Sequence, residues 1–346
     1  MAAAKKPRRP RKSSGAAAKP APVETSQPAR RGANKGLIVA IAAAVVVALL
    51  GEAFFVAKKK EAARLDLMRF GNLVPHGQCL GPAAFYGDQQ GNLDFIDVVE
   101  VGKYRLRRFD SDLNLLGTYD PTKPDEMLKN PAAVTEDSSG NIYILEGDGS
   151  GIKVLSDKLK YERTIPIKPG QTTSMDMDSK GMIDVVYKNL NEIIPYGTDG
   201  TAGQAFGAPG SKSGELAAPS KLIVAPDGND VVMESTAVGP RVKILSPAHK
   251  ILRQFYIDPS LSNPCMGLDA DGHLVFNDMP GQRGILVYDY KNGDLLCNEN
   301  ITQDNIDVIS PGGIGSDKFT GAIYIHCGAG LMECRLVHHK EPAAKK

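Results

Sequence analysis

The chain lacks the short motifs by which many enzymes are identified. It has no Gly-X-Ser-X-Gly nucleophile elbow, no phosphate-binding loop and no dinucleotide fingerprint. Its six histidines form no pair at a metal-ligand spacing. The adjacent His326 and Cys327 would point to opposite faces of a strand. These absences argue against an α/β-hydrolase, a P-loop nucleotidase and a Rossmann-type dehydrogenase, and we assign no catalytic residue and no cofactor from the sequence.

Aromatic side chains are scarce: tryptophan is absent, and residues 1–35 contain no aromatic residue at all. That segment is rich in Ala, Pro and Ser and carries ten Lys or Arg against one Glu, a charge of +9 (10 − 1). It has too little apolar surface to offset the entropy of ordering, so we expect it to be disordered. Without aromatic rings to stack on bases, it is predicted to bind anionic lipid or another polyanion rather than a specific nucleic-acid sequence.

One long apolar run follows this basic tail. Residues 36–57 contain a single charged residue, Glu52, and a helix of this length spans a hydrocarbon core of about 30 Å. Ten basic residues precede the run within residues 1–35, and five follow it within residues 58–69. The positive-inside rule therefore predicts a single-pass signal anchor, with the N-terminus in the cytoplasm and the remaining chain in the periplasm or another extracytoplasmic space.

The rest of the chain has no helical period and is built from short repeats. From about Asp66 onward a short apolar strand follows a glycine six times, and successive glycines lie 49, 41, 47, 44 and 49 residues apart. A period of roughly 40–50 residues is typical of a β-propeller, in which each repeat forms a four-stranded blade. The strands are apolar on both faces, as blades stacked around an axis require. The six strands are 91–97, 140–146, 181–187, 228–234, 272–278 and 321–327.

A short inner strand and an acidic turn precede these glycine-led strands. The inner strand opens with proline in most repeats, as at Pro82 and Pro131. The Asp side chains of the turns are expected to accept hydrogen bonds from their own backbone, while Gly supplies a positive φ. The acidic turns are 88–91, 137–140, 178–181, 227–228 and 271–272.

The order of signals in the first repeat is characteristic. Residues 67–97 run from a strand ending in Phe-Gly, through a loop, to a proline, a turn with Gly-Asn and a strand ending in Asp. Residues 195–234 repeat this order. The pattern resembles the NHL family of propeller repeats over about Asp66 to Val337, which implies an all-β, six-bladed, NHL-like propeller. The third and sixth repeats depart from the pattern, because Tyr187 and Cys327 replace the final acid.

The last repeat is one strand short. Residues 311–337 supply three strands, whereas residues 65–71 have the character of an outer strand without a blade. We expect these two parts to pair in one sheet, so that no edge is left open. The predicted organisation is a basic tail, a transmembrane helix, a linker, a six-bladed propeller and a second basic tail, at residues 1–35, 36–57, 58–64, 65–338 and 339–346.

The residue that ends the glycine-led strand is acidic in four repeats. Such acids either cap backbone N–H groups of neighbouring turns or hold a divalent cation such as Ca²⁺. We favour the structural role, because Ca²⁺ sites use irregular ligand sets rather than one symmetric ring. The strand-end acids are Asp97, Glu146, Glu234 and Asp278. If an ion is bound, the candidate ligands are Glu146, Asn189, Glu234 and Asn277.

All five cysteines lie in the predicted propeller. Cys327 and Cys334 flank a Gly-Ala-Gly turn, and we predict a disulfide across this hairpin if the compartment is oxidising. Cys265 and Cys297 fall in one repeat and are a second candidate pair. The odd number leaves at least one thiol, and buried unoxidised cysteines are the alternative.

Binding is the predicted function. Beyond residue 35 the chain carries −8 (+1 − 9), and an acidic propeller favours a basic partner surface. We interpret the chain as a membrane-anchored scaffold whose propeller face binds a protein or glycan of the cell envelope. The leading alternative is a six-bladed propeller enzyme of the calcium-dependent lactonase or lyase kind. A third is an envelope sensor whose cytoplasmic tail binds a polyanion.

Overall fold

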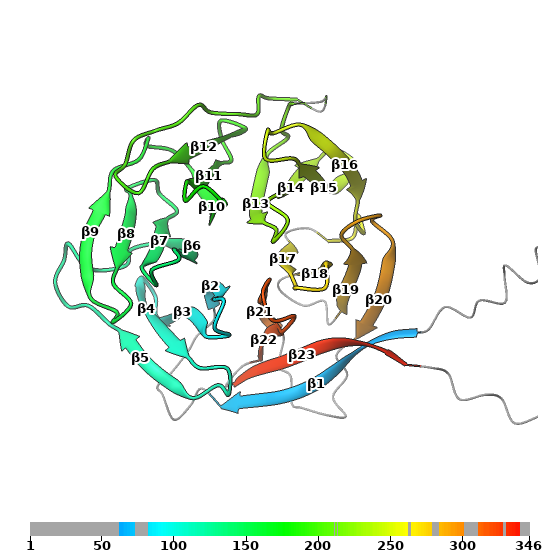
Figure 1. Cartoon of the computed structure of the whole chain (residues 1–346), viewed down its shortest axis with the longest axis horizontal. Helices are drawn as coiled ribbons and strands as arrows, with labels where there is room; N and C mark the ends of the chain where they lie inside the picture. Colours follow the sequence, from blue (N-terminus) through cyan, green and yellow to red (C-terminus); the bar gives the residue numbers. More distant parts are fainter. Residues whose placement is uncertain are drawn as a thin grey trace, which may run out of the picture. The chain divides into compact units, whose positions relative to one another are not determined.

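Each repeat of the sequence folds as one antiparallel sheet, and six sheets stand around a common axis (Figure 1). All the regular elements of the described residues are strands, so the predicted all-β six-bladed propeller is confirmed. The computed structural model describes residues 62–72, 82–210, 212, 214–261, 264–278, 284–300, 311–327 and 330–339.

Sequence order and sheet order agree in the first five blades, and the sixth blade takes its outer strand from the start of the propeller. The first three blades contain β2 (Pro82–Gly87), β3 (Leu93–Glu100), β4 (Lys103–Phe109) and β5 (Leu115–Tyr119); β6 (Pro131–Glu136), β7 (Ile142–Glu146), β8 (Ile152–Leu155) and β9 (Tyr161–Ile165); and β10 (Thr172–Met177), β11 (Ile183–Tyr187) and β12 (Glu192–Tyr196). The last three contain β13 (Pro219–Val224), β14 (Asp230–Thr236), β15 (Gly239–Leu245) and β16 (Ile251–Tyr256); β17 (Pro264–Leu268), β18 (His273–Asp278), β19 (Gly284–Asp289) and β20 (Leu295–Asn300); and β21 (Pro311–Ser316), β22 (Ile323–Cys327), β23 (Gly330–His339) and β1 (Ala62–Asn72).

Strand pairing between the two ends of the propeller closes the ring. Strand β1 pairs antiparallel with β23, from Ala62 opposite His339 to Asn72 opposite Gly330. The inner strands contact one another in the order β2, β6, β10, β13, β17, β21 and back to β2. The expectation that residues 65–71 complete the sixth blade is therefore confirmed, and the strand itself begins at Ala62.

A left-handed glycine follows the inner strand of every blade. The six φ angles lie between 78° and 85°, a region that costs a residue with a Cβ about 1–2 kcal/mol. In the first turn Asp88 Oδ1 accepts two backbone N–H groups, at 2.9 and 2.7 Å. The same bonds recur at Asp137 and Asp178. In the fifth blade Asp269 makes them rather than the expected Asp271, because Asp269 occupies the position of Asp88 relative to the glycine.

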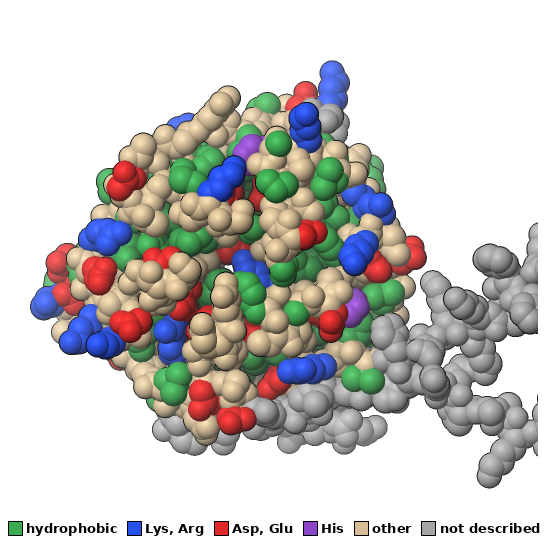
Figure 2. Space-filling view, viewed as in Figure 1, with side chains coloured by type: hydrophobic (Ala, Val, Ile, Leu, Met, Phe, Trp, Pro, Cys, Tyr) green, Lys and Arg blue, Asp and Glu red, His purple; other side chains and the backbone are tan. Residues whose placement is uncertain are grey.

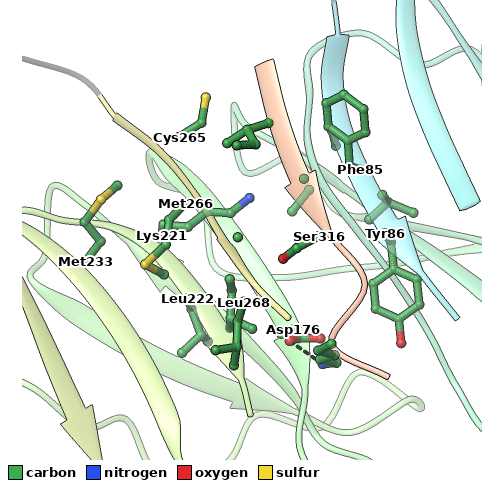
Figure 3. Close-up of a pocket in the computed structure, with 18 of the residues that line it drawn as sticks. Phe85, Tyr86, Asp176, Lys221, Leu222, Met233, Cys265, Met266, Leu268 and Ser316 are labelled. Atoms are coloured by element: carbon green, nitrogen blue, oxygen red, sulfur yellow. Dashed lines mark hydrogen bonds and ion pairs between the residues drawn. The ribbon is translucent and has the colours of Figure 1, made fainter. Parts of the chain in front are cut away.

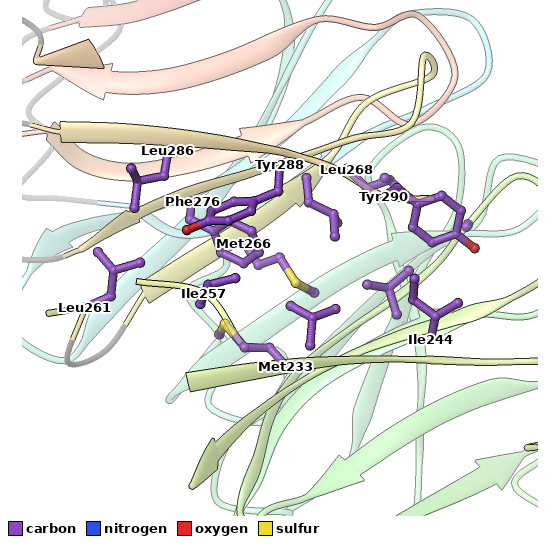
Figure 4. Packing of buried hydrophobic residues seen from close by; sticks show 14 residues of the cluster. Met233, Ile244, Ile257, Leu261, Met266, Leu268, Phe276, Leu286, Tyr288 and Tyr290 are labelled. Carbon is purple, nitrogen blue, oxygen red and sulfur yellow. The ribbon is translucent and has the colours of Figure 1, made fainter. Parts of the chain in front are cut away.

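The blades are buried on both faces, as predicted. All residues of β7 are buried. Ile144 packs in a cluster shared with the first blade, whereas Leu145 packs in a cluster shared with the third. Between the fourth and fifth blades, Met233 and Ile244 pack with Met266 in another cluster (Figure 4). The core is thus a ring of apolar layers between blades, and it leaves the axis to be filled by the inner strands.

The third blade departs from the four-stranded pattern. Among the described residues its sheet contains only β10, β11 and β12. The segment that follows makes isolated bridges instead of a fourth strand, pairing Phe206 with Ile193 and Ala202 with Tyr196. This segment is rich in glycine, which weakens a strand ladder.

The predicted basic tail and the predicted span at residues 36–57 lie outside the described residues. Among the residues that the structure does describe, no helix has the length and apolarity needed to cross a membrane.

Removal of β1 should open the propeller. Deleting residues 1–72 exposes the edge of β23, whereas deleting residues 1–61 keeps the β1–β23 pairing. We expect the shorter protein to melt roughly 10 °C or more below the 62–346 control, since about 1 kcal/mol shifts the melting temperature of a domain this large by roughly 2–4 °C. We also expect it to associate on size-exclusion chromatography. Equal melting temperatures and monomeric elution of both proteins would contradict closure by this pairing.

Candidate functional site

Two adjoining hollows follow the axis of the propeller. The first, the central cavity, has a volume of about 200 Å³ and is lined by all six inner strands. The second, the bowl, has a volume of about 900 Å³ and lies among the turns that follow these strands. Tyr86 and Lys318 line both hollows and therefore separate them. Figure 2 shows a hollow at the centre of one face, with acidic and basic side chains close to it. The central cavity is formed mainly by residues 84–87, 133–134, 175–176, 220–223, 264–268 and 314–316, and the bowl mainly by residues within 88–92, 136–140, 177–181 and 224–228.

Asp176 joins four blades beside the central cavity (Figure 3). Its Oδ1 accepts the Thr135 hydroxyl of the second blade at 2.9 Å and the Met177 N–H of its own blade at 2.8 Å. Its Oδ2 accepts the Val224 N–H of the fourth blade at 2.8 Å and the Lys318 ammonium of the sixth at 2.6 Å. Two bonds at each oxygen fill the acceptor capacity of this carboxylate, which is only 5% exposed.

One arginine joins the first two blades at the wall of the bowl. Arg108 binds Asp94 in a bidentate manner, with both N–O distances at 2.9 Å. Its Nη2 also donates to Glu136 Oε2 of the second blade at 2.5 Å. Burial raises the pKa of Glu136 above its ordinary value, whereas the charge of Arg108 opposes the rise. The arginine thus compensates two buried carboxylates with one cation.

Two of the strand-end acids form buried ion pairs within their own blades. Asp97 is bound by two arginines of β4, with N–O distances of 2.9 and 2.6 Å. Glu234 is bound by Arg241 and, at 2.9 Å, by Lys243. Neither Asp97 nor Glu234 has any exposed surface. Both carboxylates are therefore neutralised by cations of the next strand in the sheet.

The other two strand-end acids differ from this arrangement. Glu146 accepts the backbone N–H groups of Lys129 and Asn130, the closest at 2.7 Å. Asp278 lies at the end of β18 opposite Pro264, and its side chain lies outside the described part of the chain. Glu146 thus caps backbone N–H groups, which is the structural role that the sequence suggested for the strand-end acids.

The four candidate Ca²⁺ ligands are not brought together at either hollow. Glu146, Asn189, Glu234 and Asn277 line neither the central cavity nor the bowl. The carboxylates are engaged as described above, and Asn189 Oδ1 accepts the N–H of Gln171 at 3.1 Å. The buried amide of Asn277 makes no hydrogen bond with the described residues. That these four residues converge on one Ca²⁺ ion, which takes about six to eight oxygen ligands, stays a prediction.

A different group of possible ligands lies in the turn of the fifth blade. Ligand atoms of Asp269, Asp271 and His273 lie within 4.8 Å of one another. Asp269 already accepts two backbone N–H groups of its turn, and it contacts His273 Nδ1 at 2.8 Å. This hydrogen bond raises the pKa of His273. The turn geometry accounts for the cluster, and none of its members lines either hollow.

The predicted disulfide between Cys327 and Cys334 is wrong. The β22–β23 register places Cys327 opposite Gly330 and Cys334 opposite Ile323. The two cysteines are therefore displaced by four residues along the ladder, roughly 13 Å, whereas a disulfide requires Cα atoms within about 7 Å. In the fifth blade, Cys265 lies in β17 and Cys297 in β20, and two strands separate them. Neither the offset of Cys327 from Cys334 nor the separation of Cys265 from Cys297 can be read from the spacing of these cysteines in the sequence.

Sequence reasoning missed the polar residues of the inner strands. Strand registers align Lys221 with the positions of five small residues in the other blades. Asp176 likewise occupies a position that is not acidic in any other blade. A charged residue at a position that is uncharged in the other repeats was the available sequence signal for both. The small residues aligned with Lys221 are Ala84, Ala133, Ser174, Cys265 and Gly313.

Two buried acids lie near each other in the third and fourth blades. Burial raises the pKa of Asp184 to about 8, and the neighbouring carboxylate of Asp230 adds to the rise. Burial also raises the pKa of Asp230 to about 7, with a contribution from Asp178. Asp184 Oδ1 makes no hydrogen bond with the described residues. Asp230 contacts His249 Nδ1 at 3.4 Å. Asp230 stands at a position where the other glycine-led strands have Leu or Ile, but the sequence gives no sign of its acidic neighbour.

Comparison with solved structures finds lyases and a protein of unknown function with a similar fold. Streptogramin B lyase is 15% identical, with a TM-score of 0.54, and the match covers 81% of this chain and 100% of that one. A catalytically inactive variant of virginiamycin B lyase from Staphylococcus aureus, solved with quinupristin, is 17% identical, with a TM-score of 0.53 and coverages of 80% and 100%. A protein of unknown function from Bacteroides thetaiotaomicron is 12% identical, with a TM-score of 0.54 and coverages of 80% and 76%.

Sequence comparison adds no family. No protein-family model matches the chain, and no curated protein matches it. At the identities found among the solved structures, the likeness shows the propeller fold alone.

Asp184 should make the protein less stable as the pH rises. Its folded pKa of about 8 lies above the ordinary value of 3.8. Between these values the unfolded chain releases a proton that the folded chain retains, so the free energy of unfolding falls with rising pH. We expect calorimetry to show a smaller fall in melting temperature from pH 5 to pH 8 for Asp184→Asn than for the wild type.

The matched control is Asp199→Asn, because Asp199 is exposed and hydrogen bonds from Thr201 lower its pKa, away from this window. This variant should keep the wild-type pH dependence. An unchanged pH dependence in Asp184→Asn would show that Asp184 is already ionised in the folded protein.

Proposed function

We propose that this chain is a binding protein whose bowl receives a partner. The observation that carries the proposal is the bowl itself, about 900 Å³ in volume and walled by polar turns of several blades. Side chains such as Gln90, Ser138 and Ser179 are exposed there and do not form the core. Loops held by a rigid scaffold are a common location for recognition, and a propeller supplies such a scaffold.

The charge of the bowl favours a basic protein segment as the partner. Five carboxylates and three basic side chains line it. Two of the three cations are already bound by carboxylates, since Arg108 binds Asp94 and Glu136 and Lys318 binds Asp176. Lys180 is therefore the only basic residue of the described lining without an ion pair. Exposed carboxylates such as Asp157 remain available to a basic partner. A glycan, which hydroxyl and amide groups would recognise, is the second possible occupant.

The proposed cellular setting comes from the sequence. We propose that residues 36–57 anchor the chain in a membrane, that the propeller lies outside the cytoplasm and that residues 1–35 contact anionic lipid or another cytoplasmic polyanion. We also propose that the repeats are of the NHL type. The opposite charges of the basic tail and the acidic body support a division of labour between two sides of one membrane.

The enzyme alternative rests on lyase-like neighbours and predicts a cation site. Four sequence-derived ligands would have to converge, and Glu234 is already neutralised by Arg241 and Lys243. We therefore expect calorimetric titration of the full chain with CaCl₂ to reveal no micromolar site and no rise in melting temperature. A micromolar site that raises the melting temperature would favour the enzyme instead.

Photo-crosslinking tests the bowl directly. A photoreactive residue replaces Ser138 at the bowl in the full chain, and in a matched control it replaces the exposed Val238. Val238 lies between β14 and β15, at the strand ends opposite the bowl turns. We expect a discrete protein adduct from position 138 in the native membrane and none from position 238.

Charge and ligand class can then be separated. Asp157→Lys should weaken capture of a basic protein segment at least tenfold, because it reverses an exposed charge in the bowl. Binding to a glycan array that is lost in Ser138→Arg would assign a glycan instead. Equal adducts at both positions, or no adduct and no glycan binding, would contradict recognition at the bowl.

A further inference from the structure

Lys221 is the charged residue of the central cavity that forms no ion pair with a described residue. It extends from β13 into the space between β17 and β21 (Figure 3). Residues at the aligned positions of the other blades are small, and they leave room for this long side chain at the axis. Its amine makes no hydrogen bond or ion pair with the residues that the structure describes. Burial lowers the pKa of Lys221, whereas the neighbouring groups Cys265 and Asp176 of the same lining oppose the shift.

The cavity supplies no carboxylate that can pair with this amine. Asp176 and Lys318 are the other charged residues of the lining. Asp176 already accepts four hydrogen bonds, including the one from Lys318 at 2.6 Å, and its acceptor sites are filled. An amine in a poorly solvated site is stabilised only by neutralisation or by a counterion. Among the described residues, Lys221 therefore lacks the bonded carboxylate that Lys318 possesses.

The remaining lining has the character of a small-molecule pocket. Met233, Met266 and Leu268 supply apolar walls, and each of them is buried. The buried Ser316 Oγ makes no hydrogen bond with the described residues and offers a second polar contact. A volume of about 200 Å³ exceeds that of an apolar cavity of about 150 Å³ that accommodates benzene.

We propose that the central cavity binds a small monocarboxylate with an apolar group, using Lys221 as the cationic partner and Ser316 as a hydrogen-bond donor. The carboxylate supplies the counterion that Asp176 cannot provide, and the apolar group packs on the methionine and leucine walls. Binding stabilises the charged form of the amine, because the carboxylate supplies a nearby negative charge. This site is separate from the bowl and does not depend on what the bowl binds.

Benzoate is the probe, and benzyl alcohol is its uncharged counterpart. Isothermal titration of the full chain should show benzoate binding at least tenfold tighter than benzyl alcohol. Lys221→Met should reduce benzoate affinity at least tenfold and leave benzyl alcohol binding within about twofold of the wild type. Ser316→Ala should give a smaller loss, about threefold.

Folding controls keep the outcome clear. Lys221→Met should melt no lower than the wild type, because it removes a poorly solvated amine from among apolar side chains. Equal benzoate affinity in the wild type and Lys221→Met would overturn the proposal, and so would equal binding of benzoate and benzyl alcohol. Failure of benzoate to bind, with benzaldehyde and cyanoborohydride labelling Lys221 covalently, would also overturn it and assign the amine to carbonyl chemistry.

Discussion

The axis of this propeller depends on the carboxylate of Asp176. Apolar layers join each blade to its neighbours, but they do not connect blades across the ring. Asp176 accepts hydrogen bonds from the second, third, fourth and sixth blades, and Lys318 reaches it from the far end of the chain. Removing one partner of a buried ion pair typically costs about 3–5 kcal/mol, because the other charge is then left uncompensated. One acid thus fixes the relative positions of blades that share no apolar layer.

The same ion pair divides the axial space into two different environments. Lys318 and Tyr86 stand between the bowl and the central cavity. On one side, turn residues present hydroxyl, amide and carboxylate groups to solvent. On the other, inner strands surround Lys221 with mostly apolar atoms. A fold that hosts many functions can therefore carry two chemically distinct sites on one axis, and the side chains rather than the ring of blades distinguish them.

Much of the fold was predictable, because its signals are local. A glycine with φ near 80° follows each inner strand, and the sequence marks all six positions. Strands that are apolar on both faces predicted the stacking of blades. The outer strand at residues 65–71 was also recognisable from its pattern, and β1 pairs with β23 as expected. The missing fourth strand of the third blade was not predicted, since its replacement by bridges such as that of Phe206 with Ile193 depends on the course of a whole loop.

The candidate site was largely hidden from the sequence. By itself, the sequence determined the number of blades, the turns that begin their second strands and the strand that closes the ring, because neighbouring residues encode turn geometry and alternation. Only the tertiary structure decided that the acceptor sites of Asp176 are filled, that no described carboxylate bonds to the amine of Lys221 and that Cys327 is out of register with Cys334. The first two properties arise where strands from distant repeats converge on one axis, whereas the cysteine offset is set by the pairing of β22 with β23. No local sequence signal shows how many hydrogen bonds a carboxylate accepts, or how far a buried amine lies from an acidic group.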